Sequence, residues 1–261
     1  MPTLRIGVVD YVNSRPLARG LEHERASGRF ELHYLSPSRI ADGLAAGTLD
    51  VGLMPSIELA RIPALEVVPG LAIAATHEVR SVLLVSKVPI TEIRTLALDE
   101  SSRTSAALVR ILLAERYGVR PATAPAAPDL ERMLETADAA LVIGDPALRV
   151  ERERYVVLDL AGEWLELTGL PFVFAVWAAR REVASPELDT LLARSLEVGL
   201  SELDSIVAET AVESGLPEAV LRDYYTRNLR FVLGEDERRG LEEFLLRAER
   251  AGLVPVAASL L

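Results

Sequence analysis

The hydrophobic positions of the chain form short apolar, β-branched runs separated by amphipathic segments. The runs that predict strands are residues 4–9, 30–35, 49–54, 81–85, 95–98, 139–143 and 172–177. Apolar residues recur every three or four positions in segments such as 108–115 and 188–196, which predicts helices. Strands that alternate with helices indicate an α/β fold with a mostly parallel sheet covered on both faces.

Prolines mark the predicted starts of several helices. A Ser, Asn or Asp lies beside a proline in residues 13–16, 36–37, 128–129 and 185–186, which combines a capping oxygen with a preset φ angle. From residue 185 to 261 the pattern is almost wholly helical, with Leu241, Phe244, Leu245 and Ala248 on one face. We expect this part to form a helical layer on an α/β lobe.

The order of the elements predicts two lobes. Residues 1–86 plus 176–261 are expected to form lobe 1 with the C-terminal helical layer, and residues 87–175 to form lobe 2. The alanine- and proline-rich segment 121–128 is expected to be a surface connection. Ligands of such folds bind at the carboxyl ends of strands, so we expect a cleft between the lobes.

Composition narrows the class of protein. The 261 residues are 50% hydrophobic and 26% charged, and 39 acidic against 28 basic residues give a net charge of −11, as in a globular protein. No cysteine is present, which excludes disulfides, thiolate nucleophiles and thiolate metal sites. The acidic balance argues against nucleic-acid and membrane partners. Because the first residues lack the pattern of a signal peptide and no apolar run approaches ~20 residues, we expect a cytoplasmic protein.

Cofactor and metal motifs are also missing. The sequence has no Walker loop, dinucleotide glycine fingerprint, Gly-x-Ser-x-Gly elbow or His-Glu-x-x-His motif, so we expect neither cofactor nor metal. The histidines are scattered, without metal-ligand spacing. Only His77, between two predicted strands, is a plausible cleft residue.

Polar clusters follow several predicted strands. Asn13 and Ser14 follow the first strand, Ser56 the third, and Asp145 the strand at 139–143, while hydroxyl groups are densest in residues 101–105. Each cluster could simply cap a helix, or its helix N–H groups could bind an anion. Arg103 could be solvated or could contact a carboxylate. Strand ends that converge on one crevice favour a cofactor-free enzyme or a binding protein for a small carboxylated ligand.

Several motifs, taken in order, resemble the chorismate dehydratase (MqnA) family of the futalosine-dependent menaquinone pathway. They are Asp-Tyr-Val-Asn-Ser-Arg-Pro-Leu at 10–17, Asp-Val-Gly-Leu-Met-Pro-Ser-Ile-Glu at 50–58, Ser-Val at 81–82, Ala-Leu-Asp-Glu-Ser-Ser-Arg-Thr-Ser at 97–105, Ile-Gly-Asp at 143–145 and Thr-Gly-Leu-Pro-Phe-Val-Phe at 168–174. The resemblance implies a type II periplasmic-binding-protein-like fold. It also implies a cofactor-free carbon–oxygen lyase that removes water from chorismate to give 3-[(1-carboxyvinyl)oxy]benzoate.

Two alternatives and one departure accompany this resemblance. A related enzyme that acts on cyclic dehypoxanthinyl futalosine opens with Ser-Pro-Cys-Pro-Asn-Asp, which this cysteine-free chain lacks. A non-catalytic solute-binding protein for a small carboxylate could use the same fold. Residues 76–80, Thr-His-Glu-Val-Arg, replace the small residues and proline usual in the family, which leaves the role of His77 open.

The resemblance assigns roles to the polar clusters. Asn13 is expected to be catalytic. Thr104 and Ser105 would hold one carboxylate with Ser102 beside them, and Ser56 and Ser81 the other carboxylate or the ether, with Ser14 nearby. The base would be Asp145 or the enolpyruvyl carboxylate of the substrate. We favour the substrate, since two adjacent buried anions are costly. The only expected partner is the small-molecule substrate, and both a monomer and a homodimer remain open.

Overall fold

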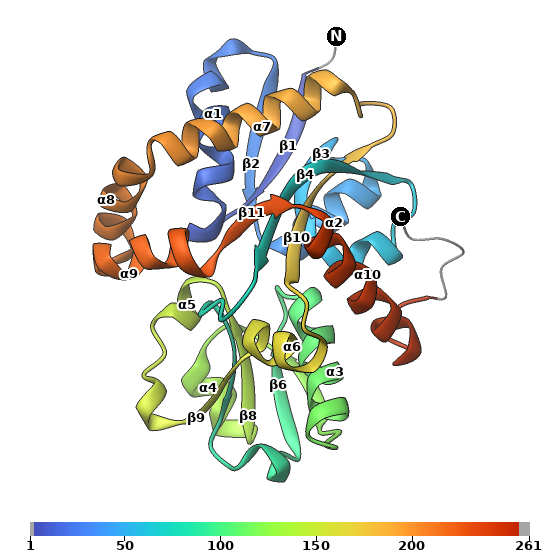
Figure 1. Cartoon of the computed structure of the whole chain (residues 1–261), viewed down its shortest axis with the longest axis vertical. Helices are drawn as coiled ribbons and strands as arrows, with labels where there is room; N and C mark the ends of the chain where they lie inside the picture. Colours follow the sequence, from blue (N-terminus) through green and yellow to red (C-terminus); the bar gives the residue numbers. More distant parts are fainter. Residues whose placement is uncertain (1–2, 256–261) are drawn as a thin grey trace.

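The computed structural model describes residues 3–255, which form two lobes that each contain one β-sheet (Figure 1). The first sheet contains β1 (Leu4–Val9), β2 (Phe30–Leu35), β3 (Val51–Pro55), β4 (Leu65–Ala75), β10 (Phe172–Arg180) and β11 (Arg230–Leu233). The second contains β5 (Val82–Ser86), β6 (Thr95–Asp99), β7 (Ala122–Ala126), β8 (Ala139–Ile143) and β9 (Val156–Asp159). The strand orders are β11-β4-β10-β3-β1-β2 and β7-β6-β8-β5-β9. The predicted two-lobed α/β architecture is confirmed.

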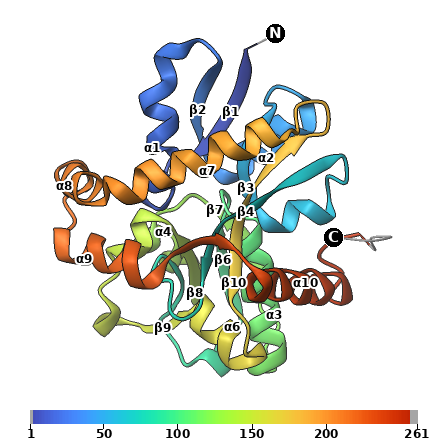
Figure 2. The same ribbon diagram turned by 45° about the horizontal axis from the view of Figure 1, so that its top comes forward.

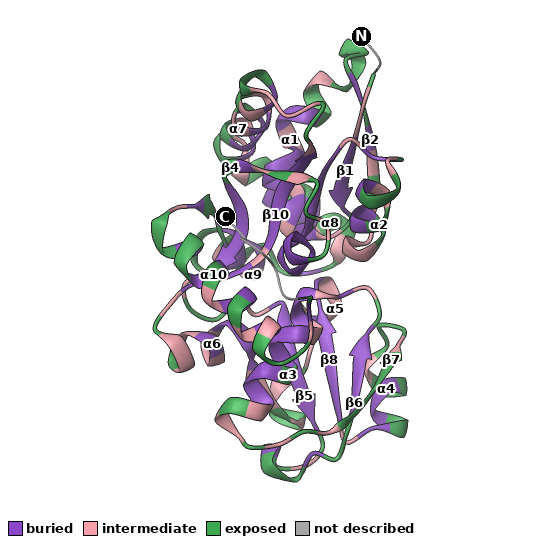
Figure 3. Cartoon of the chain, turned by 90° about the vertical axis from the view of Figure 1, so that its right-hand side faces the viewer, coloured by how far each residue is buried: buried purple, intermediate pink, exposed green. Residues whose placement is uncertain are grey.

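Helices cover both sheets. They are α1 (Arg15–Glu24), α2 (Pro37–Ala46), α3 (Thr104–Arg116), α4 (Leu130–Thr136), α5 (Asp145–Leu148), α6 (Leu160–Thr168), α7 (Pro186–Ser201), α8 (Leu203–Ser214), α9 (Glu218–Asp223) and α10 (Glu235–Arg250). Short 3₁₀ turns at Val12–Ser14 and Ser56–Ala60, and a π-helical turn at Tyr224–Asn228, lie between them. Most strand residues in both lobes are buried (Figure 3). Within residues 3–255 no helix has the length and apolar character of a membrane span.

The sheets are mixed, so the prediction of a mostly parallel arrangement was wrong. β1 pairs in parallel with β2 and β3, but β10 runs antiparallel to β3 and β4, and β5 antiparallel to β8 and β9. The chain leaves the first lobe after β4 and returns in β10, which therefore enters the first sheet in the opposite direction. Connections of this kind between lobes are not visible in a pattern of apolar runs.

All the strands predicted from apolar runs are present, but others were missed. The supposed surface connection 121–128 contains β7, an exposed edge strand in which Pro125 needs no ladder partner for its nitrogen. The C-terminal part contains the short strand β11 among its helices. Exposure and brevity hide both strands from a hydrophobicity pattern.

The two points at which the chain passes between the lobes differ from the lobe boundaries predicted from the sequence. β5 lies in the second sheet and the whole of β10 in the first. The chain therefore changes lobe before residue 82 and again before residue 172, rather than after residues 86 and 175. Residues 256–261 of the predicted first lobe lie outside the described residues.

The C-terminal helices join the rest of the molecule by close packing. Figure 2 shows α7 lying across α1, and the two helices touch where neither Gly20 nor Gly199 has a side chain. A Cβ on Gly199 would lie 1.9 Å from the carbonyl oxygen of Pro16. In the same contact the Ser195 hydroxyl donates to the Leu17 carbonyl at 2.7 Å. Farther along, α10 contacts both β10 of the first lobe and α3 of the second.

We expect Gly199→Ala to lower the free energy of unfolding by about 1–3 kcal/mol, because the added methyl group must push α7 away from α1. Alanine is the better helix former, so local propensity would act in the opposite direction. Denaturant unfolding of this variant and of Glu197→Ala, an exposed position on the same helix, measures the difference. An undiminished stability for Gly199→Ala would show that the two helices can separate without cost.

Candidate active site

A cavity of about 60 Å³ lies between the two lobes and is lined from both. The first lobe contributes Tyr11, Asn13 and the apolar side chains of Ile73 and Phe174, among others. The second lobe and its crossover contribute polar and small residues, namely Ser81, Ser102, Arg103, Thr104, Ser105 and Gly144. The carboxyl ends of β1, β6 and β8 therefore meet at one site, as the sequence predicts.

Asn13 lies in the 3₁₀ turn that connects β1 to α1. The turn is fixed on both sides, since the Val12 N–H donates to Asp145 Oδ1 at 3.1 Å and the Tyr225 hydroxyl donates to the Val12 carbonyl at 2.9 Å. The amide oxygen of Asn13 is buried and has no hydrogen-bond partner. Buried polar atoms are nearly always paired, so an unpaired one in a cavity indicates a group available to a ligand.

The start of α3 supplies the largest group of donors. Ser102, Thr104 and Ser105 are all buried, and the N-terminus of this helix has no side-chain cap. The N–H groups of its first turn are thus free to bind an anion, with the favourable end of the helix dipole behind them. This arrangement fits the carboxylate-binding role predicted for Thr104 and Ser105.

Ser56 lies behind this helix start. Its hydroxyl donates to the Val173 carbonyl at 2.7 Å and lies 3.4 Å from Thr104 Oγ1, which also accepts the Ile57 N–H at 3.2 Å. Ser56 is fully buried and is not among the residues that line the cavity. In this structure it braces Thr104 instead of facing a ligand.

Ser81 lies where the chain enters the second lobe. Ahead of it, Arg80 adopts a left-handed conformation with φ 65°. Its N–H donates to Asp159 Oδ2 at 2.6 Å, and the Val79 N–H donates to Asp159 Oδ1 at 3.0 Å. Burial raises the pKa of Asp159, and these backbone donors act against that rise. The strained turn is thus held by the carboxylate, which fixes the backbone that carries Ser81.

Tyr11 crosses from the first lobe to the second. Its hydroxyl lies 3.1 Å from Ser101 Oγ, which donates to Asp99 Oδ1 at 2.6 Å. The tyrosine ring lies against Gly144, where a Cβ would be only 2.9 Å from the ring, and the glycine φ is +66°. Burial raises the pKa of Tyr11, so its hydroxyl stays protonated. Because the single proton of Ser101 goes to Asp99, the Tyr11 hydroxyl is left as the donor to Ser101.

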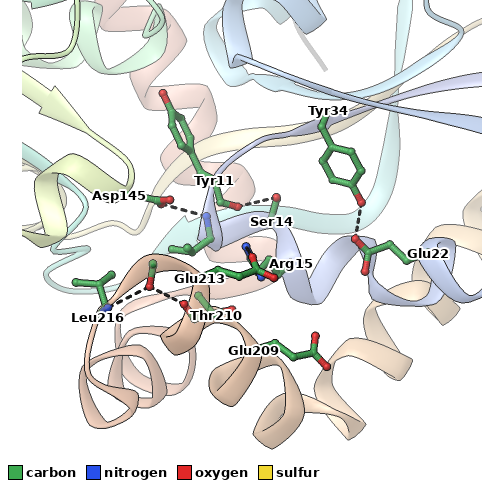
Figure 4. A network of polar contacts seen from close by, with 12 residues as sticks. Tyr11, Ser14, Arg15, Glu22, Tyr34, Asp145, Glu209, Thr210, Glu213 and Leu216 are labelled. Carbon is green, nitrogen blue, oxygen red and sulfur yellow. Dashed lines mark hydrogen bonds and ion pairs between the residues drawn. The ribbon is translucent and has the colours of Figure 1, made fainter.

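A second cavity of about 240 Å³ lies on the other side of the Asn13 turn. Ser14 and Asp145, both predicted site residues, line this cavity and not the first. Figure 4 shows the Asp145 carboxylate directed at the backbone of the turn, where it accepts the Val12 N–H. Ser14 is buried, and its hydroxyl bonds the carbonyls of Val9 and Tyr11. Burial raises the pKa of Asp145, and the Val12 N–H opposes that rise.

Charge is distributed unevenly between the two cavities. Among the described residues that line the first cavity there is no carboxylate, and the single charged side chain is Arg103. This arginine joins the lobes, with Nη2 2.7 Å from Asp42 Oδ1 and Nη1 3.3 Å from Glu58 Oε2. Although the chain has a net charge of −11, none of its acidic side chains is among the described residues that line this cavity.

Sequence reasoning missed several residues of the site, and four of the residues that it predicted there do not line the cavity: Ser14, Ser56, His77 and Asp145. It quoted Tyr11 within a motif without a role, and it noted Gly144 only as a glycine that permits close backbone approach. It did not single out Tyr224, whose hydroxyl donates to Ser81 Oγ at 2.7 Å. Tyr224 lies in a helical region far along the chain, where no local signal relates it to Ser81. His77 is exposed and lines none of the cavities described, so it is not a cleft residue here. Among residues 3–255 no cluster of three potential metal ligands occurs.

Comparisons with known proteins agree on one family and one fold. The family model for menaquinone biosynthesis matches residues 4–250. A Thermus thermophilus protein named chorismate dehydratase is 31% identical over 95% of both chains, and a Campylobacter jejuni protein of that name is 30% identical over 65% of this chain and 64% of its own.

Among solved structures, an Archaeoglobus fulgidus protein matches with a TM-score of 0.78 at 16% identity, covering 97% of this chain and 98% of its own. The periplasmic aliphatic sulphonate binding protein SsuA of Escherichia coli matches with a TM-score of 0.64 at 16% identity, over 98% of this chain and 89% of its own. These likenesses confirm the periplasmic-binding-protein-like fold and say nothing further about ligands.

The Asp99 carboxyl gives the region beside this site a pH dependence. Its pKa is raised above its ordinary value of 3.8, chiefly by burial, and Oδ2 has no hydrogen-bond partner. A raised pKa means that this carboxyl favours the folded state most at low pH and that this contribution is lost as the pH rises through the folded-state pKa. We therefore expect Asp99→Asn to gain stability relative to the wild type between about pH 4 and about pH 7. Denaturant unfolding at both pH values measures this. A difference that does not vary with pH would contradict the expectation.

Proposed function

This chain belongs to the menaquinone biosynthesis family, and from that premise we propose that it is a chorismate dehydratase. The observation that carries the proposal is the composition of the interlobe cavity. Hydroxyl groups, an asparagine amide and a free helix N-terminus surround it, and no carboxylate does so among its described lining residues. Such a site is complementary to a small dianion with an apolar ring.

The reaction is an elimination that leaves the oxidation state of the whole molecule unchanged. Chorismate loses the hydrogen on the carbon that bears the enolpyruvyl ether together with the hydroxyl on the neighbouring carbon. The products are water and 3-[(1-carboxyvinyl)oxy]benzoate, and the new aromatic ring provides the driving force. A carbon–oxygen lyase of this kind needs no electron acceptor, which supports cofactor-free catalysis.

The site residues would orient the substrate and assist the departure of hydroxide. The first turn of α3 would bind one carboxylate through its N–H groups and the hydroxyls of Thr104 and Ser105. Ile73 and Phe174 provide apolar surface for the ring. The side-chain N–H of Asn13 would donate a hydrogen bond to the departing hydroxyl, which stabilises charge that develops only as the carbon–oxygen bond breaks.

The base is best supplied by the substrate itself. Asp145 lies across the Asn13 turn in the second cavity, where its carboxylate accepts a backbone N–H. An anionic side chain beside a bound dianion would also be unfavourable. We therefore propose that the enolpyruvyl carboxylate of chorismate removes the adjacent hydrogen, with the protein as the frame that aligns the two.

Substrate entry requires the lobes to move. A cavity of about 60 Å³ is far smaller than the ~300–1,000 Å³ usual for small-molecule sites. The contacts that close it include the pairs from Arg103 to Asp42 and Glu58 and the contact from Tyr11 to Ser101. We propose that these contacts open for substrate and re-form around it, which would exclude water during the elimination.

We expect purified protein to consume chorismate without added cofactor or metal, with loss of the diene absorbance and formation of a product lighter by one water. Asn13→Ala should lower kcat by about 10²–10³-fold, the usual cost of removing one donor from a developing oxyanion. Asn228→Ala, which removes an exposed amide that donates to the Glu78 carbonyl, serves as the control.

The competing function is that of a solute-binding protein, which the same fold also serves. Chorismate that binds but stays unchanged would favour that function over a dehydratase. An Asn13→Ala variant with unchanged kcat would contradict the proposed role of the amide but not the dehydratase activity itself.

We expect Asp145→Asn to keep kcat within about tenfold of the wild type, because loss of a true general base typically costs ~10²–10⁴-fold. The asparagine retains an oxygen that can accept the Val12 N–H, so the turn should keep its conformation. Steady-state kinetics with chorismate provide the measurement. A fall in kcat beyond ~10²-fold would identify Asp145 as the base and exclude the substrate carboxylate.

A further inference from the structure

Tyr224 joins the C-terminal part of the chain to the wall of the cavity. It opens the π-helical turn Tyr224–Asn228 and is fully buried. Its hydroxyl donates to Ser81 Oγ at 2.7 Å, across 143 positions of sequence. Single π-helical turns are rare and often occur at functional sites.

This hydrogen bond determines what Ser81 can do. A serine hydroxyl has one proton to donate and two lone pairs that accept. Because Tyr224 donates, one lone pair of Ser81 is occupied and the serine proton remains available. Ser81 lines the cavity, so that proton can be directed at a ligand.

The backbone of Ser81 is already fixed without Tyr224. The Val79 and Arg80 N–H groups are held by Asp159, and the Ser81 carbonyl accepts the Gly144 N–H at 2.8 Å. These backbone contacts leave undetermined the rotation of the Ser81 side chain about its Cα–Cβ and Cβ–Oγ bonds. Tyr224 restricts that rotation.

Burial makes Tyr224 a donor that does not titrate in the working range. It raises the pKa of the phenol far above its ordinary value of 10.0, and Ser81 and Asn13 act in the opposite direction. The phenol therefore keeps its proton and cannot serve as the base.

We propose that Tyr224 is a positioning residue that orients the Ser81 hydroxyl as a donor to an anionic oxygen of the bound substrate. The inference rests on the proposed dehydratase function and extends it to a residue outside the cavity wall. Outer partners that orient a functional group typically change activity by about 10–100-fold when they are removed. Tyr224 acts only through Ser81, so its effect must vanish when the Ser81 hydroxyl is absent.

A double-mutant cycle tests this dependence. We expect Tyr224→Phe to lower kcat/KM for chorismate by about tenfold in the wild-type background. In the Ser81→Ala background the same change should alter kcat/KM by less than about twofold, the range within which independent effects are usually reproduced. Near-UV circular dichroism of each variant verifies that it is folded.

Tyr225→Phe provides the matched control. Tyr225 is the next residue and is also buried, but its hydroxyl donates to the Val12 carbonyl instead of to Ser81. Tyr225→Phe should change kcat/KM by the same factor in the wild-type and in the Ser81→Ala background, whatever the size of that factor. Equal factors for Tyr224→Phe in both backgrounds, or no effect in the wild type, would overturn the positioning role.

The same variants separate this inference from the proposed function. Affinity for isophthalate, a stable aromatic dicarboxylate, is measured by calorimetry in the same cycle. A cycle that is non-additive for isophthalate in a protein that leaves chorismate unchanged would support the positioning role and reject the dehydratase. Turnover of chorismate with an additive cycle would reject the positioning role alone. A protein that neither converts chorismate nor binds isophthalate would count against both the positioning role and the dehydratase function.

Discussion

The polar groups at the boundary between the lobes must find partners across it, because a buried polar group without a hydrogen bond costs free energy. Most of them do. The Ile57 N–H is accepted by Thr104, the Val12 N–H by Asp145, and the Tyr224 hydroxyl by Ser81. Each of these bonds joins segments far apart in sequence, so the position of one lobe depends on the other. The buried amide oxygen of Asn13 is an exception, and this residue lines the cavity between the lobes.

Within the same short segments, some residues hold the backbone in place while their neighbours remain free to contact a ligand. In the first turn after β1, the Ser14 hydroxyl bonds the carbonyls of Val9 and Tyr11, and the Val12 N–H donates to Asp145. Asn13, which lies between Val12 and Ser14, keeps its amide oxygen unpaired. At the start of α3, Ser56 braces Thr104 from behind. A ligand that reaches this cavity therefore meets groups already held in place, which reduces the reorganisation needed during a reaction.

The sequence predicts the lobes, seven of the eleven described strands and the place where polar strand ends converge. It misses β4, although residues 71–75 of that strand are buried and apolar, and the short strand β9. It identifies Asn13, Ser102, Thr104 and Ser105 because each belongs to a polar motif that follows an apolar run, and Ser81 through the family resemblance; all five line the cavity. The pairing direction of β10, the orientation of Asp145 and the contact from Tyr224 to Ser81 could not be predicted. They depend on how the chain crosses between the lobes, and crossing leaves no local pattern. Exposed or short strands such as β7 and β11 were missed for lack of a continuous apolar run.

Gly144 has a consequence for how this architecture can vary. Its missing side chain lets the Tyr11 ring rest directly on the backbone of the opposite lobe, and its positive φ independently disfavours any other residue. A side chain at this position would push the Tyr11 ring away from the second lobe and separate the two lobes by about the thickness of a methyl group. The distance between the two lobes at this point is thus set by the absence of a Cβ atom at Gly144, a residue that offers no functional group to a ligand.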